Sequence, residues 1–244
     1  VTDAANLARA SAEKRMLPSG ARVGFYDDRL RRRFLREKEL EDRFPHALAN
    51  GEFHMYLQPK VALPERCIVG AEALVRWISP EGMLCPNEFV PLFERDGVIA
   101  ELDFYMFCQV CALLKRWERE GRPLFCVSVN VSRSNFDVSD FFARYERHIA
   151  ENQVPARYLE FEFTESVVFD RTGEINQVIR RIHALGARCS MDDFGSSYSS
   201  LNMLRSLEVD IIKLDQGFFR GDTDMDKARS IVNGIVGIAR DMRI

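Results

Sequence analysis

The chain has 244 residues, of which 46% are hydrophobic and 29% are charged, so it is long enough to form one large domain with a buried core. Its formal net charge of -3 provides no overall positive field, which disfavours a protein that coats nucleic acid, and no DNA partner is expected. No run approaches the roughly 20 apolar residues that a membrane span needs, and the start lacks a signal-peptide pattern. These features predict a domain without direct membrane contact, whose parent protein could still be tethered to a membrane through a segment before Val1. A cytoplasmic location is predicted because the cysteines are typical of reduced thiols rather than of a secreted disulfide framework.

The N-terminal part differs from the rest of the chain. A helix is predicted over residues 2–15, a Pro/Gly break at 16–20, a short strand over 22–26 and a charge-alternating helix over 29–43. This is too little sequence for a domain. The three arginines at 31–33 are interpreted as a solvated helix face, with a nucleic-acid or lipid patch as the less favoured alternative.

From Phe53 onward, short β-rich runs alternate with longer helical runs, which is typical of βα units. Strands are predicted over 53–58, 68–76, 124–131, 158–164, 187–192 and 209–214. Helices are predicted over 86–95, 101–118, 138–152, 174–185, 199–206 and 224–242. This pattern gives six strands, each followed by a helix, and it suits either a barrel or a doubly wound sheet.

The cysteines and histidines indicate no metal site. The six cysteines stand in apolar contexts, which is typical of reduced, buried thiols rather than of a disulfide framework: Cys67, Cys85, Cys108, Cys111, Cys126 and Cys189. The C-x-x-C formed by Cys108 and Cys111 lacks a second cysteine pair to complete a zinc site, so core packing is predicted for both. None of the histidines stands with the carboxylates at a strand end, and all are interpreted as surface or packing residues: His46, His54, His148 and His183.

Polar side chains gather at or near the ends of the predicted strands, which is where a (β/α) barrel carries its functional groups. They are Gln58, Glu72, Arg76, Asn130, Glu162, Glu165, Asp192, Asp193 and Lys213. A single carboxylate at such a position is more often a helix N-cap or part of a loop salt bridge. If the strands close into a barrel, the polar side chains from several strands converge. The carboxylates among them would then repel one another unless cations lay between them.

The acids and the amide of this set form an all-oxygen group of ligands, which suits Mg²⁺, Mn²⁺ or Ca²⁺ rather than zinc. They are Glu72, Asn130, Glu162, Asp192 and Asp193. Adjacent aspartates allow one carboxylate to bridge two ions while its neighbour completes the second. Two metals ~3.5–4 Å apart form a clamp for in-line displacement at phosphorus.

The implied reaction is phosphodiester hydrolysis. Lys213 would stabilise or orient the attacking water, and Arg76 would donate charge-assisted hydrogen bonds to a phosphate oxygen.

Six motifs follow one another along the chain. They are GAEALVRW at 70–77, PNEFVP at 86–91, VNVS at 129–132, EFTES at 162–166, DDFG at 192–195 and DIIKLD at 210–215. In this order they resemble the EAL-domain family of bacterial signalling proteins, which takes its name from the three residues that stand here as Glu72-Ala73-Leu74. The resemblance implies an α/β fold, a (β/α)8 TIM-type barrel with an irregular strand. It also implies a hydrolase of signal transduction, a phosphodiesterase that converts cyclic di-GMP to linear pGpG.

The resemblance further implies roles for the residues above. Glu72, Asn130, Glu162 and Asp192 would hold one metal, and Asp192 and Asp193 the second. Lys213 and Glu165 would be catalytic, with Glu165 bracing the loop after Asp193, and substrate contacts would come from Gln58, Leu74 and Arg76. The implied cofactor is Mg²⁺ or Mn²⁺, with Ca²⁺ inhibitory, and the implied partners are cyclic di-GMP and a second copy of the chain in a homodimer.

Two departures from the family pattern stand out. Ser197 replaces a glycine that is common after the DDFG motif. By the same comparison, Ile244 precedes the seventh strand, so the C-terminal strands are expected to be missing, which leaves open whether this chain is active.

Residues 1–28 resemble, more weakly, the end of a GGDEF (diguanylate cyclase) domain, residues 29–44 its helical linker, and residues 45–244 a C-terminally incomplete EAL domain.

Two alternatives to the enzyme remain. One is a catalytically silent receptor that binds cyclic di-GMP, although degenerate receptors usually lose Glu72 or the paired aspartates, and both are present here. The other is an unrelated barrel enzyme that acts on a different phosphate ester.

Overall fold

The computed structural model describes residues 28–196, 207–219 and 225–244. The elements expected over 2–15, 22–26 and 199–206 therefore lie outside the described residues. The described residues form two compact units. One runs up to His54 and includes Trp77–Arg95, and the other consists of Met55–Arg76 and the described residues from Asp96 onward. All the residues proposed above for the site belong to the second unit.

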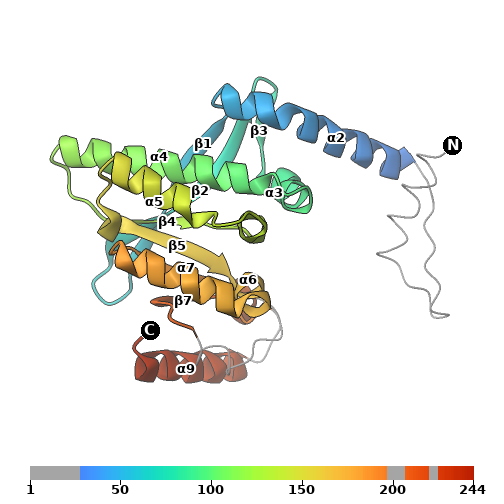
Figure 1. The fold of residues 1–244 in the computed structure, drawn as a ribbon. Coiled ribbons are helices and arrows are strands. Elements are labelled where there is room, and N and C mark those ends of the chain that lie inside the picture. The colour runs from blue at the N-terminus through green and yellow to red at the C-terminus, as the bar shows by residue number, and fades with distance from the viewer. Residues whose placement is uncertain (1–27, 197–206, 220–224) are drawn as a thin grey trace, which may run out of the picture. The chain divides into compact units, whose positions relative to one another are not determined.

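The strands follow the predicted order with additions (Figure 1). They are β1 (Phe53–Ala62), β2 (Cys67–Ser79), β3 (Gly82–Leu84), β4 (Cys126–Asn130), β5 (Leu159–Thr164), β6 (Arg188–Phe194) and β7 (Ile211–Leu214). The expectation of a helix after every strand is wrong for β1, because a turn over 63–66 leads directly into β2. The turn is closed by the N–H of Arg66 donating to the carbonyl of Ala62 at 2.8 Å.

The helices also match most of the predicted ranges. They are α2 (Asp28–Ala49), α3 (Pro86–Arg95), α4 (Ile99–Arg119), α5 (Phe142–Glu151), α6 (Glu165–Asp170), α7 (Thr172–Ala184) and α9 (Met225–Met242), with 3-10 turns at Arg133–Asp137, Ala156–Tyr158 and Gln216–Phe218. The sequence pattern did not predict β3 or α6, which span only 3 and 6 residues. No described helix is long and apolar enough to cross a membrane.

The strands form one sheet in the order β1-β2-β4-β5-β6-β7, with β3 paired to β2. The pairs from β2 through β7 are parallel, and β3 is antiparallel to β2. Four strand spacings separate β2 from β7, so a flat sheet would hold them roughly 19 Å apart. Lys213 of β7 nevertheless reaches Glu72 of β2 with an N–O distance of 2.9 Å. The sheet is therefore strongly curled, which confirms the barrel-type fold, although its path is not closed among the described residues.

The two faces of the curled sheet differ. On one face, the second unit packs the apolar sides of α4, α5 and α7 against strand residues such as Val127, Phe161 and Met191 (Figure 1). Alternate residues of β5 point to the opposite face, where Glu160 and Glu162 are also buried. The strand is thus buried on both sides, with an apolar side toward the helices and a polar side toward the inside of the curl.

In the first unit, buried aromatic rings join α2, β1, β2 and α3. They are Phe44, Phe53, Trp77, Phe89 and Phe93, with ring centroids 4.6–6.5 Å apart. The indole N–H of Trp77 donates to the Glu52 carboxylate at 2.8 Å, so the one polar atom of the ring is satisfied.

All six cysteines are free, and the expectation that all are buried is wrong for two of them. Cys67 is exposed where β2 begins after the turn, and Cys85 is exposed between β3 and α3. Both lie where the chain passes between elements, which a local apolar context does not reveal.

The aromatic cluster predicts a large cost for truncating Phe89. Phe89→Ala is expected to lower the free energy of unfolding by about 3–5 kcal/mol, because the ring is fully buried and the cavity cannot be refilled. Phe34→Ala on α2 is the matched control, and its 40% exposed ring predicts a change within about 0.5 kcal/mol. Urea unfolding of both variants tests this, and equal midpoints would contradict it.

Candidate active site

A β-bulge places the paired aspartates at the end of β6. The register with β7 shifts between Met191, which faces Ile212, and Phe194, which faces Leu214. Two residues of β6 therefore stand opposite Lys213 alone. Asp193 takes a left-handed backbone conformation with φ 55°, which aspartate tolerates better than most residues, and its N–H donates to Asp192 Oδ1 at 2.8 Å. The bulge thus sets Asp192 and Asp193 together opposite Lys213.

Three carboxylates from three different strands meet at the ammonium of Lys213. Its Nζ lies 2.9 Å from Glu72 Oε2 on β2, 2.6 Å from Glu162 Oε2 on β5 and 2.7 Å from Asp192 Oδ2 on β6. Carboxylate oxygens of these three acids lie within 4.8 Å of one another. The second unit therefore brings together the central residues of the predicted metal site. Asn130 joins them through its Nδ2, which donates to Glu72 Oε1 at 3.2 Å.

A second lysine supports this cluster from β1. Lys60 Nζ lies 2.8 Å from Glu162 Oε1 and 2.8 Å from Glu160 Oε1, and Ser190 donates its hydroxyl to the same Glu160 oxygen at 2.9 Å. The Glu160 and Glu162 side chains are 3% and 0% exposed, so neither could stay charged here without a cationic partner.

The site prediction from sequence missed Lys60 and Glu160. Alternation along strands was the available signal, because Lys60 shares a strand face with Gln58, and Glu160 shares one with Glu162.

The electrostatics of the cluster balance burial against opposite charge. Burial opposes the ionised form of Glu162, but Lys213 and Lys60 outweigh it and hold the pKa of this carboxyl below its usual value. Burial likewise opposes the charge of Lys213, yet Glu162, Asp192 and Glu72 raise its pKa. Asp193 behaves differently, because burial and then the negative charges of Asp192 and Asp215 raise its pKa. The Asp193 carboxylate is therefore surrounded by more negative than positive charge.

The cluster opens into a cavity of about 540 Å³. Its lining residues are Gln58, Pro59, Lys60, Glu72, Leu74, Asp192, Asp193, Ile211, Lys213 and Gln216. Gln58 and Leu74, which were predicted to contact substrate, thus line the same cavity as both aspartates. Arg76 is not among the lining residues. Its guanidinium donates to the Val75 carbonyl at 2.8 Å and lies 5.6 Å from the centroid of the Tyr56 ring.

Glu165 holds the loop after the bulge. Its Oε2 accepts from the N–H of Gly195 at 2.8 Å, and its residue is only 3% exposed. Gly195 has φ 94°, and a Cβ there would come within 2.2 Å of the Phe218 ring, so no other residue fits without rearrangement. This geometry agrees with the predicted bracing role of Glu165. Ser197, the departure from the family pattern, lies outside the described residues.

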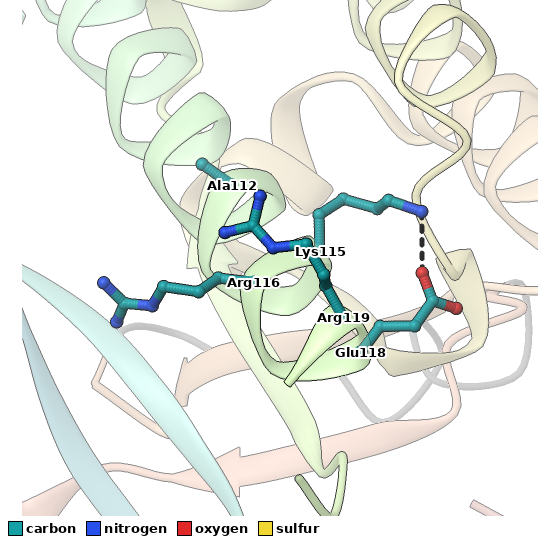
Figure 2. Close-up of a pocket in the computed structure, with 5 residues that line it drawn as sticks. All are labelled: Ala112, Lys115, Arg116, Glu118 and Arg119. Atoms are coloured by element: carbon teal, nitrogen blue, oxygen red, sulfur yellow. Dashed lines mark hydrogen bonds and ion pairs between the residues drawn. The ribbon is translucent and has the colours of Figure 1, made fainter. Parts of the chain in front are cut away.

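Another cavity, of about 370 Å³, lies beside α4 (Figure 2). All its lining residues belong to this one helix: Ala112, Lys115, Arg116, Glu118 and Arg119. Lys115 is already paired with Glu118 at 2.6 Å and also donates to the carbonyl of Gln153 at 3.1 Å. The first cavity is therefore the better candidate for a reaction site.

Comparisons with known proteins agree with the fold and the site. The EAL domain family model matches residues 41–244, so the chain belongs to the EAL domain family. A cyclic di-GMP phosphodiesterase of Pseudomonas aeruginosa is 36% identical over 191 residues, which cover 78% of this chain and 32% of that protein. The cyclic di-GMP phosphodiesterase NbdA of the same organism is 29% identical over 90% of this chain and 28% of its own length. The chain thus spans a third or less of the length of these two curated relatives.

Two solved structures share the architecture. The PaMucR phosphodiesterase in complex with c-di-GMP superposes with a TM-score of 0.77 and 28% identity, covering 84% of both chains. The FimX EAL domain of Pseudomonas aeruginosa bound to c-di-GMP superposes with a TM-score of 0.74 over 84% of this chain and 82% of that one. Its identity of 19% supports a common fold alone. The family and fold inferred from the sequence motifs are confirmed.

The bracing contact predicts how Glu165 variants behave. Glu165→Ala leaves the half-buried Gly195 N–H without its acceptor and is expected to lower the free energy of unfolding by about 1 kcal/mol. Glu165→Gln keeps an acceptor oxygen and should lose less. Urea unfolding, together with faster hydrogen exchange at the Gly195 amide in the alanine variant, tests this contact. Unchanged exchange at Gly195 would show that the loop is held by other groups.

The three ion pairs of Lys213 predict a stability that depends on cations. Lys213→Met leaves Glu72, Glu162 and Asp192 facing one another, and we expect a loss of about 3–5 kcal/mol in the presence of a chelator. Added Mg²⁺ should restore part of the loss. Lys115→Met is the control, because its ion pair is at the surface and is worth less than about 1 kcal/mol. A Lys213→Met chain with wild-type stability in chelator would show that these ion pairs do not hold the acids together.

Proposed function

We propose that this domain hydrolyses cyclic di-GMP to linear pGpG with the help of divalent cations. The observation that carries the proposal is the meeting of Glu72, Glu162 and Asp192, from three strands, around one positive charge at the wall of a cavity. The phosphodiesterases among the relatives support the same reaction class.

The donor set fits Mg²⁺ or Mn²⁺. Two oxygens bound to one Mg²⁺ lie roughly 3–4 Å apart, and the oxygens of Glu72, Glu162 and Asp192 fall within 4.8 Å of one another. Asn130 can add an amide oxygen, because an amide can be turned to present either its nitrogen or its oxygen. Asp193, beside Asp192 and short of positive charge, is the proposed ligand of a second ion.

Divalent cations bound there would polarise the phosphate and lower the pKa of the attacking water. In the hydrolysis, the water oxygen forms a bond to phosphorus, one P–O bond to the ribose breaks, and the leaving oxygen gains a proton. Lys213 would orient the water and stabilise negative charge near it. Gln58 and Leu74 would position the dinucleotide in the cavity, and Glu165 would hold the loop that carries Asp193.

Arg76 has the least direct support among the proposed substrate contacts. Its guanidinium is engaged with the Val75 carbonyl and the Tyr56 ring rather than directed at the cavity. A phosphate contact requires this side chain to leave the ring. Lys60 is the better placed cation, since it lines the cavity and already contacts Glu162.

Other parts of the proposal follow from the family resemblance. Ca²⁺ is expected to inhibit, because its longer and more flexible coordination suits the two-ion clamp poorly. A homodimer and a cytoplasmic location remain predictions. The alternative function, a silent cyclic di-GMP receptor, is disfavoured because Glu72, Asp192 and Asp193 are all present at the cavity.

The proposal predicts turnover that requires both metal and Glu72. Incubation of the chain with cyclic di-GMP and Mg²⁺ should yield pGpG by chromatography, and a chelator should abolish the product. Glu72→Gln is expected to reduce turnover at least about 100-fold, because loss of outer partners of metal ligands alone costs roughly 10–100-fold. Glu151→Gln, at an exposed position of α5, should leave it unchanged.

Binding of cyclic di-GMP measured in the same samples separates the alternatives. Binding without turnover in the wild-type chain would support the receptor. Turnover that persists in Glu72→Gln would overturn the assignment of this ligand.

A further inference from the structure

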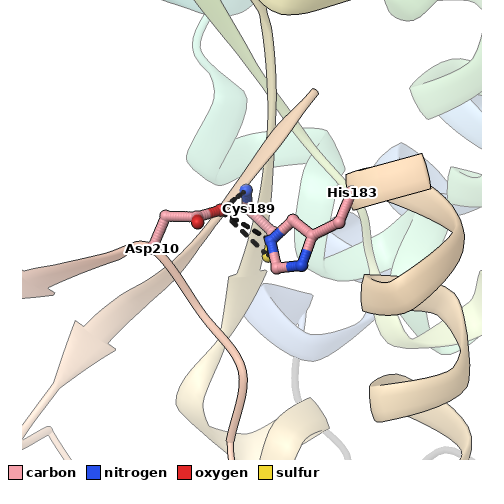
Figure 3. Close-up of side chains that lie close together, drawn as sticks. All are labelled: His183, Cys189 and Asp210. Atoms are coloured by element: carbon pink, nitrogen blue, oxygen red, sulfur yellow. Dashed lines mark hydrogen bonds and ion pairs between the residues drawn. The ribbon is translucent and has the colours of Figure 1, made fainter. Parts of the chain in front are cut away.

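Among the described residues, a second group of side chains lies close enough to share a cation, at the opposite ends of β6 and β7 from the cavity (Figure 3). It consists of His183 near the end of α7, Cys189 near the start of β6, and Asp210 just before β7. The imidazole of His183 points toward the thiol and the carboxylate (Figure 3). The sequence predicted a surface or packing role for His183, because it does not stand with the carboxylates at a strand end. It predicted a buried thiol for Cys189, because that residue stands in an apolar context.

The three donor atoms form a triangle of suitable size for zinc. His183 Nε2 lies 3.0 Å from Asp210 Oδ2 and 3.7 Å from Cys189 Sγ, and Cys189 Sγ lies 3.6 Å from Asp210 Oδ2. Tetrahedral zinc, with Zn–S of about 2.3 Å and Zn–N and Zn–O of about 2.0–2.2 Å, separates its ligand atoms by roughly 3.3–3.6 Å. Small shifts of side chains would bring all three atoms to bonding distance from one ion.

We propose that His183, Cys189 and Asp210 form a second metal site, selective for Zn²⁺ or a similar borderline ion. Nitrogen and thiolate ligands favour such ions, whereas the all-oxygen set at the cavity favours Mg²⁺ or Mn²⁺. Three protein ligands leave one coordination position for water. The His183 and Asp210 side chains are each 35% exposed, which gives an ion a path from solvent, while Cys189 is fully buried beneath them.

The backbone already fixes two of the three ligands. The N–H of Cys189 donates to Asp210 Oδ2 at 2.8 Å, and the N–H of Asp210 donates to the carbonyl of Cys189 at 2.9 Å. This reciprocal pair sets the carboxylate against the start of β6 before any ion arrives. Hydrogen bonds of this kind to a ligating carboxylate orient it and raise metal affinity.

Without an ion, the same atoms can satisfy one another by hydrogen bonds. Burial, and then the charge of Asp210, raise the pKa of the Cys189 thiol, so the thiol can donate to the carboxylate. A purely hydrogen-bonded cluster is therefore the alternative that the experiment has to exclude. If an ion binds, it joins α7, β6 and β7 at a point three residues before Asp192 on one strand and three before Lys213 on the other.

Cobalt is the probe that separates this site from the acidic cavity. The 244-residue chain, stripped of metal and then kept in excess Mg²⁺ to fill oxygen sites, is titrated with Co²⁺. We expect one equivalent to produce thiolate-to-cobalt charge-transfer absorption in the near ultraviolet, which carboxylates alone cannot give. Zn²⁺ should then displace the signal and raise the melting temperature.

Variants at the three ligands should remove these effects. His183→Gln and Asp210→Asn are expected to weaken Co²⁺ and Zn²⁺ binding at least about tenfold, since even outer partners of ligands are worth roughly 10–100-fold. Cys189→Val should abolish the charge-transfer band. Asp210→Asn retains an oxygen to accept from the Cys189 N–H, so its fold is preserved.

The matched controls are Cys108→Ala and His148→Gln, which remove a separate thiol–imidazole contact in the second unit, 3.7 Å between Sγ and Nδ1. Both should bind Co²⁺ as the wild type does. A titration without a thiolate band, a band that survives Cys189→Val, or a Zn²⁺ effect that persists in His183→Gln would overturn the proposal and leave a hydrogen-bonded cluster. None of these measurements depends on hydrolysis of cyclic di-GMP.

Discussion

The burial of two carboxylates on one strand is the constraint on which the second unit depends. Glu160 and Glu162 lie on the inner face of β5 with almost no exposure, and each would be costly there without a cation. The compensating charge comes from the two ends of the sheet, Lys60 on β1 and Lys213 on β7. Both lysines can reach the central strand only if the sheet curls. The ion pairs of Glu160 and Glu162 therefore depend on the curvature of the sheet.

The same constraint explains why the site is suited to a cation. Lys213 faces three acids at 2.6–2.9 Å, and Lys60 contacts Glu162 and Glu160 at 2.8 Å, so the carboxylates of the cluster outnumber its two ammonium groups. Asp193, the second residue of the bulge, has a raised pKa, because burial and then the charges of Asp192 and Asp215 outweigh the charge of Lys213. Added positive charge at the cavity would stabilise the ionised forms of Asp193 and of the three acids around Lys213. A divalent ion at the cavity would offset part of the repulsion between these acids, which supports the proposed metal site.

Much of this arrangement could be predicted because it follows strand ends. Glu72, Glu162 and Asp192 were selected as polar residues at strand ends, and parallel strands bring such ends to one edge. Lys60 was missed because the predicted strand ended at residue 58, whereas β1 continues to Ala62. Glu160 was missed because only residues near the ends of the predicted strands were considered. The turn after β1 was not predicted, because a helix was expected after every strand. The sequence could not predict the side-chain conformation of Arg76. From one backbone position, so long a side chain can either stack on Tyr56 or extend to the cavity.

The two ends of β6 and β7 carry donor sets of different chemistry. At one end the oxygens of Asp192 and its neighbours suit hard cations, and at the other the nitrogen and sulfur of His183 and Cys189 suit softer ones. Only a few residues separate the two sets along each strand, yet opposite strand ends keep them from sharing an ion. A cell that supplies both kinds of ion could fill both sets without competition. β6 carries both Cys189 and Asp192, and β7 begins just after Asp210 and carries Lys213. An ion that restrains Cys189 and Asp210 would therefore also restrain Asp192 and Lys213. The proposed zinc site would then affect the geometry of the acidic site without contacting its substrate.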